Sequence, residues 1–216
     1  MLTEAHRMLL VPKKPYLLGV TTQTSTGTPI TLRRSRYEAG VVNYALIFRH
    51  AGGTAAPGTP TGFTNIANST TDPDYRQAWE YSNGSVGPTT TSTATSATSM
   101  SGIVLSFSGS ANQTPTGGGV VTATSTTPDP GSITASPVGM WVLFFAYCAW
   151  NGSASVTGWP ADTVRGWQVS QGTNGGCAVA MMPHTCLGTR DFGPFTLSAS
   201  VVNRAGVFGI RQHYAA

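Results

Sequence analysis

The side chains that could carry out chemistry are few and poorly arranged for catalysis. Nucleophilic catalysis needs a Ser or Cys beside a base and an orienting acid, and no G-x-S-x-G elbow occurs in the sequence. His184 and Cys186 are two positions apart and would share one face of a strand, but nothing near them in the sequence supplies an oxyanion hole. An acyl-transfer site is therefore not expected.

The carboxylates favour neither glycoside hydrolysis nor metal binding. The chain holds only 8 Asp and Glu residues, and a glycosidase needs two carboxylates at a set separation. Asp72 or Asp74 could pair with Glu80, but turn and surface acids are the simpler interpretation. The spacing of Asp72 and Asp74 also matches no known calcium loop. The sequence predicts a protein that is not an enzyme, with no catalytic residue, cofactor or metal.

The state of the three cysteines stays open at this point. Cys148 lies within an apolar run and is most simply a small buried hydrophobic residue. Cys177 and Cys186 either pair, join His184 as metal ligands, or remain free thiols in a reducing compartment. Zinc sites normally bring their ligands in close pairs, and only His184 and Cys186 are near each other. Free thiols are the simplest interpretation.

Two tryptophans are candidates for glycan binding. Trp159 stands just before Pro160 in an expected turn, and Trp167 follows it closely. The aromatic rings of lectin-like sites stack on pyranose faces, while polar neighbours bind the hydroxyl groups. The alternative is that both rings fill the hydrophobic core at the ends of the domain. Trp141 and Trp150 lie in the long apolar run and are expected in the core.

Most of the positive charge lies near the N-terminus. The net charge is +4, and seven of the 12 Lys and Arg residues stand in the first fifty positions. We expect residues 1–35 to form an extended arm, because Pro12, Pro15 and Pro29 exclude a long helix. An arm of this kind orders on a partner, at roughly 1–2 kcal/mol per fixed residue; a solvated terminus is the alternative. The candidate partner-binding residues are Lys13, Lys14, Arg33, Arg34 and Arg36.

After this arm, the pattern predicts short β-strands. Residues 41–49 alternate with a period of two, which places Tyr44, Leu46 and Phe48 on one face. Residues 138–150 are apolar on both faces and predict a central strand that is covered on each side. Further strands are expected at 75–82, 102–107, 120–127, 165–171, 177–182, 195–201 and 204–211. The Thr/Ser-rich residues 84–100 are expected to form a long loop that ends in an edge strand. No convincing helix is present, so the sequence predicts an all-β protein.

Composition supports this fold class, and the sequence also indicates the cellular compartment in which the protein is made. Charged residues make up 9% of the 216 residues, against about 25% in typical globular domains, so hydroxyl and amide groups must solvate the surface. No apolar run reaches the roughly 18 residues of a membrane span. The start does not resemble a secretory signal, because Glu4, His6 and Arg7 interrupt any apolar segment. We expect synthesis in the cytoplasm, no membrane contact, and no direct nucleic-acid binding, because the basic residues do not interleave with aromatic ones.

The order of these segments resembles the jelly-roll domains of tailed-bacteriophage virion proteins, of the kind found in head spikes, head decoration proteins and tail-associated adhesion modules. The segments are YALIFR (44–49), TPTGF (59–63), AWEYS (78–82), GIVLSFSG (102–109), WVLFFAYCAW (141–150), GW (158–159) and VVNRAGVFGIR (201–211). Such domains also resemble concanavalin-like lectin sandwiches.

The resemblance covers roughly residues 36–212 and leaves the arm outside it. It implies an antiparallel jelly-roll β-sandwich over residues 36–216, preceded by the arm of residues 1–35. It also implies a structural role on a virion that assembles in the host cytoplasm, with other capsid or tail proteins and further copies of the chain as partners. A carbohydrate-binding adhesion module for host surface glycans is the alternative.

Overall fold

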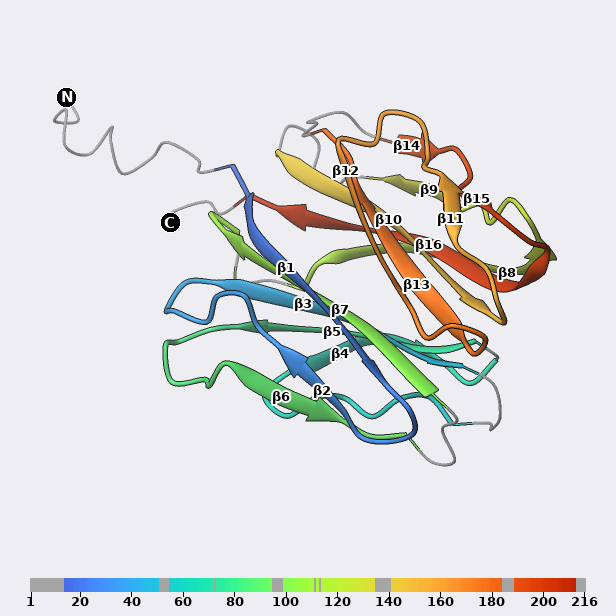
Figure 1. Ribbon diagram of the computed structural model, residues 1–216. Helices are drawn as coiled ribbons and strands as arrows, with labels where there is room; N and C mark the ends of the chain where they lie inside the picture. The colour runs from blue at the N-terminus through green and yellow to red at the C-terminus, as the bar shows by residue number, and fades with distance from the viewer. Residues whose placement is uncertain are drawn as a thin grey trace, which may run out of the picture.

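A computed structural model describes most of the chain (Figure 1). The described residues are 14–50, 55–71, 73–94, 99–110, 112, 114–134, 141–183 and 189–212. Within them all regular structure is strand, and the paired strands run antiparallel. The prediction of an antiparallel all-β fold is therefore confirmed.

The first half of the chain forms a five-stranded sheet, which we call sheet 1. Its strands follow the spatial order β1-β7-β3-β5-β4. They are β1 (Tyr16–Ser25), β7 (Ser99–Ser108), β3 (Val42–His50), β5 (Asp74–Tyr81) and β4 (Thr64–Ser69). A two-stranded ribbon of β2 (Ile30–Arg33) and β6 (Thr89–Ser92) packs on the outer face of sheet 1 and lies at the bottom of Figure 1.

The second half of the chain forms sheet 2, in the order β12-β13-β10-β16-β8. Its strands are β12 (Arg165–Ser170), β13 (Gly175–Met181), β10 (Val142–Asn151), β16 (Val201–Arg211) and β8 (Thr116–Ser125). Two ribbons cover its outer face, and both lie at the top of Figure 1. They are β9 (Gly131–Thr134) with β14 (Thr189–Phe192), and β11 (Val156–Gly158) with β15 (Thr196–Leu197).

The main core lies between the two sheets. Alternation along β3 places Tyr44, Leu46 and Phe48 in this core, as the period of two predicts. The ring of Phe208 on β16 stacks on Tyr44 at a centroid distance of 3.9 Å and on Phe145 at 5.0 Å. Aromatic side chains from both sheets therefore interdigitate, which fixes the sheets face to face.

Strand β10 is apolar on both faces because it lies in the middle of a covered sheet. Leu143, Phe145 and Tyr147 point into the core between the sheets. Phe144 and Trp150 point the other way, into a second core that the outer ribbons close. The sequence prediction of a central strand covered on each side is confirmed.

Residues 16–35 differ from the expected arm, because most of them are strands of the folded unit. β1 pairs with β7 along its whole length, and Ile30 and Leu32 of β2 are fully buried against sheet 1. Polar residues dominate β1 because it is an edge strand, and a bulge between Leu17 and Gly19 interrupts its alternation. The folded unit therefore begins near residue 16 and not at residue 36.

The two halves of the chain repeat one strand order. Read from β8, sheet 2 has the order β8-β16-β10-β13-β12, which matches β1-β7-β3-β5-β4 strand for strand once β11 and β15 are set aside. In each half the second strand also pairs with the penultimate strand of the matched set: β2 pairs with β6, and β9 pairs with β14. Residues 16–108 and 116–211 are thus two copies of one topology.

Sequence and backbone support this repeat at an offset of 100 positions. Residues 19–26 (GVTTQTST) and 119–126 (GVVTATST) are identical at six of eight positions. Both halves also contain the same turn: the amide of Phe63 donates to the carbonyl of Pro60 (3.0 Å), and the amide of Thr163 donates to that of Pro160 (3.3 Å). The third residue of each turn has a positive φ, +88° and +63°.

Candidate functional site

The first described basic residue, Lys14, lies where several distant segments of the chain meet. Its Nζ is 3.6 Å from the centroid of the Trp141 ring, a cation–π contact. The Trp141 carbonyl accepts from the Gln212 amide (2.9 Å), and Gln212 also forms an isolated bridge with Ser110. The start of β1 and the end of β16 therefore lie close together. Lys13 lies outside the described residues.

Arg34 was expected on a partner-binding arm, but the structure places it inside the fold. It is 6% exposed, and its guanidinium forms an ion pair with Glu80 in which Nη2 and Oε2 are 2.8 Å apart. Its Nη1 donates to the carbonyls of Gly87 and Thr89, each at 2.9 Å. The assignment of Arg34 to partner binding is therefore wrong, because its charge and donors are used internally.

The remaining basic candidates do not gather into one patch with Arg34. Arg33 is exposed on β2, and Arg36 is exposed and 3.8 Å from a carboxylate oxygen of Glu38. Ion pairs this exposed contribute little to stability. Arg33 and Arg36 remain available to a partner together with Lys14, whereas Arg34 does not.

Trp159 lies on the outer face of sheet 2, where its ring covers Gly166 of β12. A Cβ atom added to Gly166 would stand 2.6 Å from Cη2 and 2.7 Å from Cδ2 of the indole. These two atoms lie on opposite sides of the six-membered ring, so the ring lies flat over the glycine. The ring also makes an edge-to-face contact with Phe195 (5.9 Å, 60°). Trp159 is still 37% exposed.

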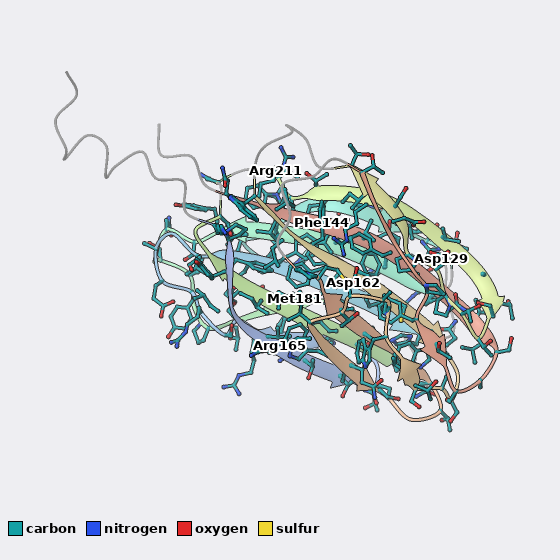
Figure 2. The ribbon with its side chains drawn as sticks, turned by 90° about the horizontal axis from the view of Figure 1, so that it is seen from above. Asp129, Phe144, Asp162, Arg165, Met181 and Arg211 are labelled. Atoms are coloured by element: carbon teal, nitrogen blue, oxygen red, sulfur yellow. The ribbon has the colours of Figure 1, made fainter. Side chains whose placement is uncertain are left out.

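The turn that follows Trp159 carries one member of an ion pair. The turn after Trp159 presents Asp162, whose Oδ2 accepts a hydrogen bond from Nη2 of Arg190 at 2.7 Å. Arg190 is further held over the ring of Phe192 on the same ribbon (5.7 Å). Asp162 and the nearby Arg165 are labelled in Figure 2. We call Trp159, Asp162, Gly166, Arg190 and Phe195 together the Trp159 surface.

Trp167, the other candidate for glycan binding, does not belong to this surface. It is partly buried and packs against the core between the sheets, as does Val169 two positions along β12. Because side chains alternate along a strand, Trp167 points to the face of β12 opposite to Gly166 and the Trp159 ring. The structure therefore separates the two tryptophans that the sequence grouped.

Gly166 and Arg190 were not predicted from the sequence, although both belong to the Trp159 surface. Gly166 is needed because any side chain there would overlap the indole. The available signal was the pair of turns 100 positions apart, in which Trp159 replaces Thr59 and Asp162 replaces Gly62. A comparison of the two halves would have marked this turn as the one that diverged.

A polar chain crosses the main core but has no contact with solvent. The hydroxyl of Tyr44 donates to Gln77 (2.7 Å), whose amide in turn donates to the hydroxyl of Tyr147. Burial raises the pKa of both tyrosines well above 10.0. These groups are neutral at physiological pH and are enclosed by aromatic rings, which suits a role in fixing sheet register.

The described cysteines are buried and protonated. Cys148 and Cys177 are both free thiols with no exposed surface. Burial raises the pKa of Cys177 to about 12, although the hydroxyl of Ser101, 3.3 Å from its sulfur, acts in the opposite direction. His184 and Cys186 lie outside the described residues, so their pairing and metal-binding alternatives stay open.

Comparison with known proteins finds no match. No family model, no curated protein and no solved structure matches it. Among the described residues, no three His, Cys, Asp or Glu side chains are grouped so as to hold a metal ion. The described part of the chain also contains no helix that is long and apolar enough to cross a membrane.

Proposed function

We propose that the protein is a non-enzymatic structural component of a tailed-bacteriophage particle, either a head decoration or spike protein or a tail protein. The observation that carries the proposal is the strand order, which supports a jelly roll in each half. In a jelly roll the first strand pairs with the last, the last also pairs with the third, and the second pairs with the penultimate one. β1, β7 and β3 have these relations, β2 pairs with β6, and the second half repeats the scheme. The proposed architecture is two jelly rolls in tandem, whereas the sequence suggested one over residues 36–216.

Attachment is proposed at the end of the fold that carries Lys14. Residues 1–13 precede this point in the sequence, and Lys14 itself is fixed on Trp141. The proposed partners are other capsid or tail proteins and further copies of this chain, and the proposed location is the virion. The exposed Arg33 and Arg36 add positive charge for an acidic neighbour.

The test is incorporation into particles made in the host from a genome that carries this gene. Particles are banded in a density gradient, and the protein is quantified by mass spectrometry. We expect the full chain to sediment with the particles and a chain lacking residues 1–13, with Lys14→Ala, to be lost from them. A Lys14→Arg chain, which keeps the charge, is the control. Absence of the full chain from particles would overturn the proposed function, and retention of the shortened chain would overturn attachment through this end.

Carbohydrate binding is proposed as a second function because of one observation. The Trp159 ring is fixed from one side and leaves 37% of the residue exposed on the surface of a β-sandwich. Host surface glycans are the proposed ligands, as for an adhesion module. The test is binding of glycans to the purified chain, which does not depend on attachment to a particle.

A further inference from the structure

We infer that the Trp159 surface is a stacking site for a neutral oligosaccharide of gluco-configured pyranose rings. This inference rests on the proposed carbohydrate-binding function and names its site and ligand class. The site is asymmetric: it exists in the second half of the chain and is lacking at the equivalent turn of the first half.

The ring of Trp159 has the geometry of a preformed platform. One face lies on Gly166 and the ring also contacts Phe195, so the indole cannot rotate freely and ligand binding does not have to order it. Trp159 keeps 37% of its surface exposed, and we assign this exposed part of the ring to the ligand. A pyranose ring whose substituents are all equatorial presents a flat set of axial C–H groups, which is the shape that covers an aromatic face.

The ion pair on the turn after Trp159 favours a neutral sugar as the ligand. Asp162, three positions after Trp159, and Arg190 bind each other at 2.7 Å, so their charges cancel. A carboxylate and a guanidinium still offer acceptors and donors to sugar hydroxyls. Asp162 is 68% exposed in its side chain and Arg190 is 27% exposed, so both groups are within reach of solvent and of a ligand.

The first half of the chain supplies an internal comparison. Its equivalent turn has the same Pro60–Phe63 hydrogen bond, but Thr59 stands where the second half has Trp159. The polar contact across this turn is also different: the hydroxyl of Thr90 on β6 donates to the carbonyl of Thr61 (2.9 Å), where the second half has the ion pair of Arg190 with Asp162. The shared scaffold therefore does not require an exposed tryptophan or an ion pair at this turn.

The experiment is calorimetric titration of the full-length chain with chitohexaose and cellohexaose, and with β-1,4-mannohexaose, whose axial 2-hydroxyl disturbs the flat face. We expect a dissociation constant of about 1 mM or lower for at least one of the first two. Trp159→Ala should weaken binding by at least about tenfold, and Trp159→Phe should weaken it less. Gly166→Ala should weaken binding although Trp159 is retained, because the new methyl group displaces the ring. Thr59→Ala, at the equivalent turn, is the matched control and should bind as the unmodified chain does.

The outcomes separate the site from the function. No binding by the unmodified chain to any of the three sugars overturns carbohydrate binding and the inference with it. Binding that Trp159→Ala and Gly166→Ala leave unchanged overturns the site alone, and equal binding of mannohexaose overturns the ligand class. Thermal unfolding of each variant is recorded, and an effect is assigned to the site only where the melting temperature stays within a few degrees of the unmodified chain. If Trp159→Ala fails this criterion, Gly166→Ala and Trp159→Phe decide.

Discussion

Removal of the Glu80 carboxylate should be among the most damaging single changes in sheet 1. Glu80 is 4% exposed and binds the guanidinium of Arg34 through both oxygens, and its Oε1 also accepts from the side-chain amide of Asn43 at 3.0 Å. In Glu80→Ala, Arg34 keeps the carbonyls of Gly87 and Thr89 but loses its only described carboxylate partner. Leaving one member of a buried ion pair uncompensated costs about 3–5 kcal/mol. We expect Glu80→Ala to lose about this much of its free energy of unfolding.

The assay is urea unfolding at neutral pH, followed by tryptophan fluorescence and far-ultraviolet circular dichroism, with stability taken from the linear extrapolation. The matched control is Glu38→Ala, which removes the exposed partner of Arg36 and should change stability by about 0.5 kcal/mol or less. The double variant Arg34→Met with Glu80→Leu removes both charges and should recover most of the loss. A loss below about 1 kcal/mol in Glu80→Ala, or equal losses in Glu80→Ala and the control, would refute the reasoning that Arg34 is an internal structural residue.

Three further results are expected. Phe208→Ala should lower the free energy of unfolding by about 3–5 kcal/mol in the same urea assay, because Phe208 stacks on both Tyr44 and Phe145 between the sheets; a loss under about 1 kcal/mol would contradict this packing. Cys177, whose pKa is raised to about 12, should resist iodoacetamide at pH 8 in the folded chain and react fully in urea, as read by mass spectrometry; rapid reaction without denaturant would show that the thiol is accessible. Tyr44 and Tyr147 have raised pKa values, so the folded chain holds their protons more strongly than the unfolded chain does. The contribution of these two groups to the free energy of unfolding should be constant below the unfolded pKa of 10.0 and should fall as the pH rises above it. Absorbance at 295 nm should show these two groups ionising only on unfolding.

The sequence predicts the interior strands well, because buried positions produce a clear pattern of apolar residues there. Tyr44, Leu46 and Phe48 alternate with side chains of the outer face, and the run around Phe145 is apolar at every position because β10 is covered on both sides. These apolar patterns depend on whether a position is buried, and not on which strand covers it. They can therefore be read from one chain without knowledge of how the strands pair.

The edge strands and the binding residues could not be predicted in the same way. β1 is Thr-rich and bulged beside Leu17, so its sequence looks like a turn-prone arm, and only its pairing with β7 makes it a strand. In the sequence, nothing distinguishes Arg34 from its neighbour Arg33. In the structure only Arg34 is buried, and its ion-pair partner Glu80 lies 46 positions away on β5. The Trp159 surface depends on Gly166 across a turn and on Arg190 from another ribbon, so it is a product of the tertiary fold.

The division of the chain into two matched halves also bears on how it reaches its native state. All strands of sheet 1 lie before residue 109 and all strands of sheet 2 lie after residue 115, yet each sheet uses the other to cover its aromatic face. During synthesis the leading half leaves the ribosome with that face bare until the trailing half follows, which is the situation in which nascent chains aggregate or exchange halves with a neighbour. Crowded polysomes should therefore favour intertwined dimers, in which the leading half of one molecule closes on the trailing half of another.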